Sequence, residues 1–345
     1  MKLLITGGCG FVGSSLARYF KTGYPDYQIT VLDNLYRKGS ELNVKPLQDM
    51  GITFVKGDVR NLTDISALDF DMLIEASAEP SVMAGRGSDR RYLIDTNLNG
   101  LINCLDAAVE KNAKIIFLST SRVYPMSAIN SLRFIVTDSR YDLATSMTDG
   151  VSETGFSERL TINGARSLYG ATKLAGELMI QEYAEMFELQ AVVNRCGLIA
   201  GPGQFGKTDQ GVITHWAASY IYDKPLAIFG SGKQVRDILN VKDLARLIDM
   251  QMHGFNKFAG ETFNVGGGLA NSLSINELDA LCKKLIGPKD VPYKEVRDLD
   301  LKYYVTDNNK IAHYNWEPVI SAEDTLKDII SWLTDNKEEL RWIFA

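Results

Sequence analysis

The chain begins with Met1-Lys2-Leu3-Leu4-Ile5-Thr6-Gly7-Gly8-Cys9-Gly10-Phe11-Val12-Gly13, the stretch that decides its fold. The stretch reads as a short apolar strand that breaks into glycines and continues as an amphipathic helix through Phe20. In such a unit the first glycine permits a tight turn, the second lets the backbone approach a pyrophosphate, and the third lets the helix pack on the strand. The N–H groups of the helix N-terminus then face the negative charge. The spacing of Gly7, Gly10 and Gly13 therefore predicts a dinucleotide site.

An acidic residue ends the second predicted strand about twenty residues further on, where a dinucleotide-binding unit needs one. Gln28-Ile29-Thr30-Val31-Leu32 is rich in β-formers and is followed by Asp33. The Asp33 carboxylate can accept hydrogen bonds from the adenosine ribose hydroxyls, and it would repel a 2′-phosphate. Arg37 and Lys38 are near enough in the sequence to admit such a phosphate. We therefore expect NAD as the cofactor, with NADP as the alternative.

Composition limits the classes of protein to which the chain can belong. Its 345 residues suffice for one large or two ordinary domains, and 45% apolar and 23% charged residues are typical of a globular protein. A formal net charge of −6 argues against nucleic acid or an anionic membrane as a partner. No apolar run approaches the length of a membrane span, and the first strand begins too early to leave room for a signal peptide. We expect a cytoplasmic protein.

Cysteine and histidine give no sign of a disulfide framework or a metal site. The cysteines are widely scattered, at Cys9, Cys104, Cys196 and Cys282. The histidines are isolated and lack ligand spacing, at His215, His253 and His313. The sequence therefore predicts no bound metal.

Apolar strands alternate with helical patterns through the first part of the chain. Strands are expected at 52–58, 71–78, 114–119 and 191–195, and a long helix at 92–110. This alternation predicts an α/β fold, a doubly wound parallel sheet of the Rossmann type. At the end of the first of these strands, Asp58 could accept from the adenine amino group or be a plain loop carboxylate.

Hydroxyl-bearing residues follow the strand at 114–119, in the run Ser119-Thr120-Ser121-Arg122. Ligands of doubly wound sheets lie outside the carboxyl ends of the strands, so these hydroxyls face the site. Further on, Tyr169 and Lys173 are four residues apart in a predicted helix and share one of its faces. An adjacent ammonium stabilises a phenolate and lowers the pKa of a tyrosine from about 10, which makes it usable as an acid and base.

With these motifs together, the chain resembles the extended short-chain dehydrogenases/reductases that act on nucleotide sugars, over nearly its whole length. The resemblance implies that Tyr169 is the acid/base and that Lys173 lowers its pKa and binds the nicotinamide ribose. It also implies that Thr120 hydrogen-bonds the reacting sugar oxygen and that Asn97 lies near the cofactor. The expected cofactor-binding residues are Gly7, Gly10, Phe11, Val12, Gly13, Asp33, Asn34, Asp58, Val59, Ala76, Ser77, Ala78, Asn97, Tyr169 and Lys173.

Departures from the family pattern limit which of the family's reactions we expect for this chain. The 4,6-dehydratases of the family have an Asp-Glu pair after the threonine, which supplies the acid and base for water elimination. This chain has Ser121 and Arg122 there. Because arginine cannot act as that base, dehydration is disfavoured. In addition, Glu75 replaces the more usual histidine after the fourth strand, and Pro125 replaces a glycine.

The resemblance also implies a second, smaller mixed α/β domain that binds the nucleotide sugar. We expect a NAD-binding domain over 1–200, to which the chain returns near 240–266. The nucleotide-sugar domain is expected over 201–239 and 267–345.

Candidate substrate contacts come from both domains. Arg236 and Arg297 match family arginines on the diphosphate, and a guanidinium fork suits phosphate oxygens. Asp209 and Gln210 could hold the nucleotide or cap the helix that follows. The polar segment between Thr120 and the Tyr169 helix could cover the sugar or be a surface excursion. The expected substrate-binding residues are Thr120, Ser121, Arg122, Gln204, Asp209, Gln210, Arg236 and Arg297.

Within the family, stretches such as 230–237 and 263–278 are similar to the CDP-paratose 2-epimerase subfamily. That resemblance implies transient oxidation at C2 of a CDP-3,6-dideoxyhexose by a resident NAD, with the hydride returned to the opposite face. It also implies a homo-oligomer that pairs through the helices near 92–110 and 167–187. A UDP-hexose 4-epimerase would use the same residues. A dehydratase or reductase of the same family, or a non-catalytic NAD-binding scaffold, are the remaining alternatives.

Overall fold

The computed structural model describes residues 1–85, 89–207, 210–296 and 300–344. These described residues form two compact units. Unit 1 comprises residues 1–123, 167–195 and 245–262, and unit 2 comprises the rest. Residues 124–166 thus group with unit 2, whereas the sequence led us to expect an unbroken first domain over 1–200.

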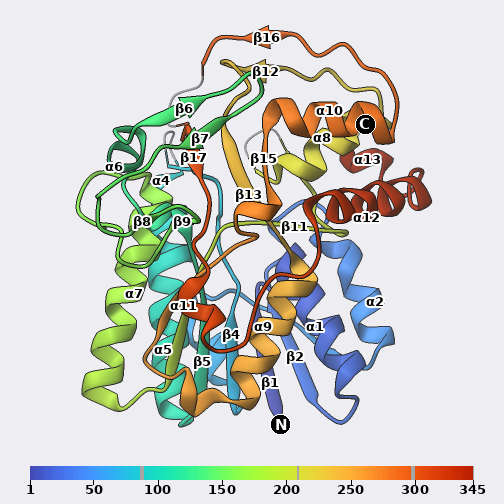
Figure 1. Cartoon of the computed structure of the whole chain (residues 1–345). Helices are drawn as coiled ribbons and strands as arrows, with labels where there is room; N and C mark the ends of the chain where they lie inside the picture. Colours follow the sequence, from blue (N-terminus) through green and yellow to red (C-terminus); the bar gives the residue numbers. More distant parts are fainter. Residues whose placement is uncertain (86–88, 208–209, 297–299, 345) are drawn as a thin grey trace. The chain divides into compact units, whose positions relative to one another are not determined.

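The central sheet confirms the predicted fold class. Among the described residues it has seven strands, in the order β14-β10-β5-β4-β1-β2-β3. The pairs from β3 through β2, β1 and β4 to β5 all run parallel, and the order reverses between β1 and β4, as in a doubly wound sheet. Figure 1 shows β5, β4, β1 and β2 side by side in this order. The strands are β1 (Lys2–Thr6), β2 (Gln28–Asp33), β3 (Thr53–Lys56), β4 (Met72–Glu75), β5 (Lys114–Thr120), β10 (Ala191–Cys196) and β14 (Thr262–Val265).

The long helices that the sequence predicts near 92–110 and 167–187 begin and end close to the expected positions. The predicted helix at 92–110 runs from Arg90 to Glu110, but a π-helical turn, Asp95–Asn99, interrupts it. The helices of unit 1 are α1 (Phe11–Gly23), α2 (Val44–Asp49), α3 (Leu62–Ser66), α4 (Arg90–Ile94), α5 (Gly100–Glu110), α7 (Leu168–Phe187) and α9 (Val241–His253).

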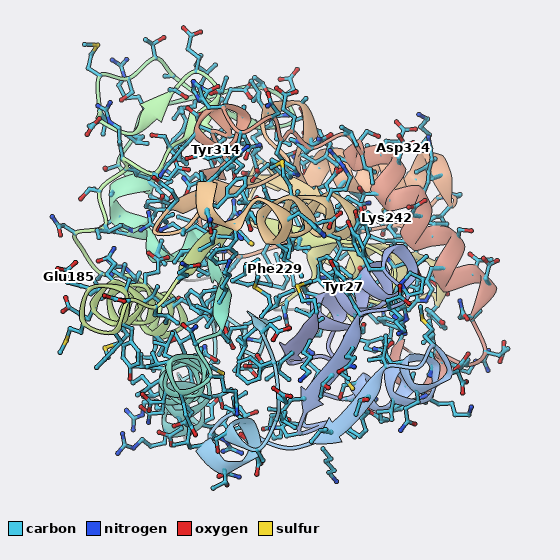
Figure 2. All side chains as sticks on the ribbon, turned by 90° about the horizontal axis from the view of Figure 1, so that it is seen from below. Tyr27, Glu185, Phe229, Lys242, Tyr314 and Asp324 are labelled. Carbon is cyan, nitrogen blue, oxygen red and sulfur yellow. The ribbon has the colours of Figure 1, made fainter. Side chains whose placement is uncertain are left out.

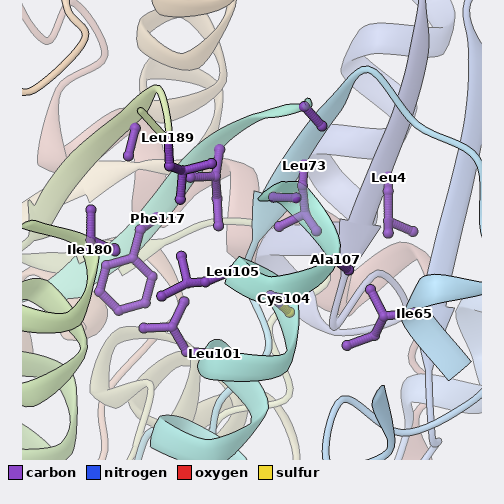
Figure 3. Packing of buried hydrophobic residues seen from close by; sticks show 14 of the residues in the cluster. Leu4, Ile65, Leu73, Leu101, Cys104, Leu105, Ala107, Phe117, Ile180 and Leu189 are labelled. Atoms are coloured by element: carbon purple, nitrogen blue, oxygen red, sulfur yellow. The ribbon is translucent and has the colours of Figure 1, made fainter. Parts of the chain in front are cut away.

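One face of the sheet packs on α5 and α7. Successive strand side chains point to opposite faces, so Leu4, Leu73 and Phe117 reach the same side. There they pack with Leu101 and Leu105 of α5 in a fully buried cluster (Figure 3). Each such side chain contributes roughly 1.5–3 kcal/mol by leaving water. This core fixes α5 and α7 against the strands whose carboxyl ends carry the candidate site.

Unit 2 is built on short strands around β13 (Val235–Asn240). This strand pairs with β11 (Leu198–Ala200), β15 (Ser272–Ser274) and β17 (Tyr303–Tyr304). The other strands form separate pairs: β6 (Phe134–Val136) with β7 (Tyr141–Leu143), β8 (Val151–Ser152) with β9 (Gly155–Phe156), and β12 (Ile228–Phe229) with β16 (Tyr293–Lys294). The helices are α6 (Met126–Asn130), α8 (Val212–Ile221), α10 (Ile275–Leu285), α11 (Asn309–Ala312), α12 (Ala322–Asp335) and α13 (Arg341–Phe344).

Side-chain caps begin two of these helices. The Ser321 hydroxyl accepts a hydrogen bond from the backbone N–H of Asp324, in the first turn of α12, at 3.0 Å. Asp324 is labelled in Figure 2. Ser274 and Glu277 form a full capping box at the start of α10. Over the described ranges, no helix is both long and apolar enough to cross a lipid bilayer.

Candidate functional site

The glycine turn after β1 leaves no room for side chains. Gly7 has a φ of +63°, and a Cβ atom on it would lie 2.8 Å from the Ala76 carbonyl oxygen and from the Ser77 Cα. A Cβ on Gly13 would lie 2.3 Å from the Gly7 carbonyl oxygen. The turn is therefore held against the loop that follows β4, and the predicted residues Ala76 and Ser77 lie beside it. Phe11 and Val12 open α1 at this point, with their backbone N–H groups in its first turn.

Asp33 holds the same turn from the end of β2. Its Oδ2 accepts from the Cys9 backbone N–H at 2.9 Å, and its Oδ1 accepts from the Leu35 N–H at 2.8 Å. Burial raises the pKa of the Asp33 carboxyl, and these backbone donors oppose that rise. Gly10 is a third backbone donor to this carboxylate. A carboxylate has about four acceptor positions, so Asp33 can still accept from a ribose hydroxyl. Asp33 thus supports the cradle that it was predicted to complete.

Asp58 is more heavily engaged than the sequence suggested. Arg60 donates to Oδ1 from its backbone N–H (3.0 Å) and from Nε (2.9 Å), and to Oδ2 from its guanidinium at 2.6 Å. Asn34 donates to Oδ2 at 2.9 Å. The hydrogen bonds from Arg60 lower the pKa of Asp58 to about 2. With about four acceptor positions on a carboxylate, this geometry favours the loop-carboxylate alternative over an adenine contact. The neighbouring Val59 is buried, and its carbonyl accepts from Asn103 at 2.8 Å.

Asn97 lies within the π-helical turn and is 1% exposed. Its amide accepts from the Glu79 N–H at 2.8 Å and donates to the Glu79 carbonyl at 3.1 Å. It also donates to the Thr172 hydroxyl at 3.3 Å, which in turn donates to the Tyr169 carbonyl at 2.8 Å. Asn97 therefore ties the loop after β4 to the first turns of α7. A π-helical turn often marks a functional position in a helix.

The start of α7 is fixed against the end of β5. Ser167 caps the helix by accepting from the Gly170 N–H at 3.1 Å. A Cβ on Gly170 would lie 2.0 Å from the Arg122 carbonyl oxygen, so the turn after β5 touches the first turn of the helix. Thr120, whose hydroxyl accepts from the Arg122 N–H at 3.2 Å, is the last residue of β5. Ser121 and Arg122 form the following 3₁₀ turn, so the structure brings Thr120 and Tyr169 into one neighbourhood.

Lys173 is buried beside an acidic partner. The Lys173 Nζ donates to Glu75 Oε2 at 3.3 Å and lies 4.3 Å from the centre of the Phe117 ring. The hydroxyl of Ser77 donates to the other Glu75 oxygen. The sequence marked Glu75 as a departure from the family pattern, but 98 residues separate it from Lys173, so no local pattern predicted the pair.

A second buried ion pair anchors the same helix one turn further on. Arg195 of β10 donates to both oxygens of Glu177, at distances of 2.7 to 3.1 Å. The Ser119 hydroxyl of β5 donates to Glu177 at 2.5 Å. Tyr169, Lys173 and Glu177, spaced by four residues, form one buried stripe of α7.

The predicted substrate residues of unit 2 that the structure describes contact other residues of that unit. Arg236 donates to Asp300 Oδ1 at 3.0 Å and to the Val235 carbonyl at 2.7 Å. Gln204 donates to the Ile199 carbonyl at 3.0 Å and accepts from Thr214 at 3.0 Å. Gln210 forms an isolated bridge with Lys207. Asp209 and Arg297 lie outside the described residues.

Comparison with known proteins agrees with this arrangement. The "NAD dependent epimerase/dehydratase family" matches residues 3–266. The CDP-paratose 2-epimerase of Salmonella typhi is 32% identical, over 96% of this chain and 99% of that protein.

Solved structures have the same fold. The UDP-glucuronic acid 4-epimerase from Bacillus cereus, in complex with UDP-glucuronic acid and NAD, matches with a TM-score of 0.81 and 25% identity, over 97% of this chain and 99% of that one. The dTDP-glucose 4,6-dehydratase from Bacillus anthracis, in complex with NAD, matches with a TM-score of 0.79 and 25% identity, over 99% of each chain. Both comparisons and the glycine cradle that a Cβ would fill lead to one conclusion: the chain belongs to the NAD dependent epimerase/dehydratase family, and its cofactor is NAD.

Proposed function

We propose that this chain is a nucleotide-sugar epimerase, and most specifically a CDP-paratose 2-epimerase. The observation that carries the proposal is the buried stripe of α7, with Tyr169 8% exposed beside the turn that follows Thr120. The CDP-paratose 2-epimerase of Salmonella typhi, similar over its whole length, supports the substrate.

The chain's residues have separate tasks in this reaction. Tyr169, as phenolate, takes the proton of the sugar hydroxyl and returns it later. The Lys173 ammonium stabilises that phenolate and donates to the nicotinamide ribose, and the Thr120 hydroxyl hydrogen-bonds the reacting sugar oxygen. Bound NAD supplies the hydride acceptor and donor. Rotation or a shift of the keto-sugar between its oxidation and its reduction would present the opposite face of the ring to the bound NAD.

The geometry supports a direct cofactor contact at some of the predicted residues and an indirect role at others. The glycine turn leads into α1, whose first backbone N–H groups suit a pyrophosphate, and Asp33 keeps an acceptor position for a ribose hydroxyl. Asp58 has its acceptors engaged by Arg60 and Asn34 and is proposed to shape the adenine end rather than bind it. Asn97 is proposed to act by fixing the loop after β4.

Elimination of water is disfavoured at this site. Ser121 and Arg122 occupy the 3₁₀ turn after Thr120, and arginine can neither take nor release the proton that elimination requires. A second candidate, a UDP-hexose 4-epimerase, is supported by the fold of the Bacillus cereus UDP-glucuronic acid 4-epimerase. It would use Thr120, Tyr169 and Lys173 in the same way on a sugar that is turned differently.

Nuclear magnetic resonance of the purified protein tests the substrate directly. The protein is incubated, without added NAD, with CDP-paratose and separately with UDP-galactose and UDP-glucose. Inversion at C2 of the CDP sugar is the expected result. Inversion at C4 of a UDP sugar would replace the substrate and keep the mechanism, and no change in any of them would contradict the proposed function.

A further inference from the structure

The ion pair between Glu75 and Lys173 lies at the point where β4 ends and α7 passes. Both side chains are 2% exposed, and Nζ and Oε2 are 3.3 Å apart. The carboxylate is itself fixed, because its second oxygen accepts from Ser77 in the loop that packs on Gly7. The ammonium is confined on another side by the Phe117 ring, at 4.3 Å from its centre.

The surroundings of the pair are apolar. Cys104 of α5 is fully buried, and its pKa is raised well above the ordinary value, chiefly by burial. The Glu75 charge adds to that rise and the Lys173 charge opposes it, so both charges act at this thiol. An unpaired charge in such a place is strongly disfavoured, and the loss of one partner leaves the other uncompensated.

The donors of Lys173 are only partly used by this pair. An ammonium has three N–H donors, and Glu75 takes one of them. Because a lysine side chain has four rotatable bonds, an ammonium without an anchor would sample several positions. The carboxylate therefore selects one position and leaves two donors for another ligand.

We propose that Glu75 is a positioning residue for the cofactor, and that it holds the Lys173 ammonium where the nicotinamide ribose of NAD accepts its hydrogen bonds. Glu75 acts only through Lys173 and does not contact the cofactor itself. The inference rests on the role of Lys173 given under the proposed function.

A double-mutant cycle on NAD affinity tests the proposal, with affinity measured by equilibrium exchange of labelled NAD on the full chain. Glu75→Gln keeps the shape and removes the charge, and we expect it to weaken binding by about tenfold, the effect of a lost charge-assisted contact. Glu75→Asp changes the shape and keeps the charge, and it should weaken binding less. Lys173→Met should weaken binding at least as much as Glu75→Gln, and adding Glu75→Gln to Lys173→Met should change nothing further, within about twofold.

Three outcomes would overturn the proposal: unchanged affinity in Glu75→Gln, an equal loss from Glu75→Gln in the Lys173→Met background, or a larger loss in Glu75→Asp than in Glu75→Gln. Thermal unfolding provides an independent check should a single variant fold poorly. The double variant lacks both charges, so it should unfold at a higher temperature than Lys173→Met, which leaves a buried carboxylate alone. A double variant no more stable than Lys173→Met would also count against the pairing.

The exchange experiment involves no sugar. If no sugar is inverted while the affinity cycle shows coupling, the proposed function fails and the role of Glu75 stands. If a sugar is inverted while the cycle shows none, the role of Glu75 fails alone.

Discussion

Tyr169 presents a hydroxyl from the most buried stripe of α7, and the proposed chemistry depends on that single atom. We expect Tyr169→Phe to lower turnover by about 10²–10⁴-fold, the range for loss of a general acid/base, while NAD remains bound. Tyr183 lies further along the same helix, and its hydroxyl donates to Asp106 of α5. Tyr183→Phe removes that hydroxyl, so it is the matched control and should keep full turnover. Unchanged turnover in Tyr169→Phe would show that Tyr169 is not the acid/base, and a parent protein without turnover would favour the non-catalytic scaffold.

Gly170 can be tested by a single added methyl group. Its Cβ would lie 2.0 Å from the Arg122 carbonyl oxygen, so Gly170→Ala must push the turn after β5 away from α7. We expect the free energy of unfolding to fall by about 1–3 kcal/mol, as for other overpacked sites. Chemical denaturation measures it. Gly23→Ala is the control, because a Cβ there meets nothing within 4 Å. Equal stability of the two variants would show that the turn and the helix are not in tight contact.

The hydrogen bonds from Arg60 to Asp58 make the free energy of unfolding depend on pH in the acid range. Hydrogen bonds from Arg60 lower the pKa of Asp58 to about 2 in the folded protein, below the ordinary 3.8. Their contribution is therefore fully present above about pH 4 and is lost as the pH falls toward 2. Arg60→Gln should reduce this loss, measured as the change in urea unfolding free energy between pH 5 and 2.5. A variant that loses as much stability as the parent over that interval would contradict the assignment.

At the scale of elements, Glu277 joins two parts of unit 2. Its carboxylate caps α10 by accepting from the Ser274 N–H at 2.8 Å. It also accepts from the Ser139 hydroxyl at 2.9 Å and from Arg140 at 3.3 Å, at the β6–β7 connection. We expect Glu277→Ala to raise amide hydrogen exchange both in the first turn of α10 and over residues 134–143. Ser274→Ala should affect α10 alone, at a cost of about 1 kcal/mol. Unchanged amide exchange over residues 134–143 in Glu277→Ala would show that the contacts of Glu277 with Ser139 and Arg140 do not stabilise the β6–β7 hairpin.

Elements with local signals were predictable from the sequence. The glycine turn, Asp33 at the end of β2 and the four-residue spacing of Tyr169 and Lys173 depend on neighbours in the chain, and the structure places them as expected. The fold class, the family and NAD as cofactor were predicted and are confirmed. The roles given to single site residues stay predictions.

Features that depend on distant partners were not predictable. The pairing of Glu75 with Lys173 joins residues 98 apart. Arg60 is only two residues from Asp58, but the order of residues does not show that its guanidinium turns back onto that carboxylate. The π-helical turn has no periodic signature, because its five residues read as ordinary helix. Segment 124–166 has strands of two or three residues, too short to show alternation.

At the scale of the whole molecule, the two units contain different sets of the predicted site residues. Unit 1 contains the glycine cradle and the predicted residues Asp33, Thr120, Ser121, Arg122, Tyr169 and Lys173. Unit 2 contains the described candidates Gln204, Gln210 and Arg236 for the nucleotide sugar. The homo-oligomer expected from the sequence stays a prediction, and sedimentation of the purified protein measures it.

In the proposed reaction, the inverted carbon loses and regains the same hydride within one site. The most direct test uses CDP-paratose labelled with deuterium at C2, incubated with the protein in ordinary water without added NAD. We expect the epimerised product to keep its deuterium at C2. Replacement of that deuterium by hydrogen from water would show that the carbon loses a proton rather than a hydride, and would contradict the proposed reaction.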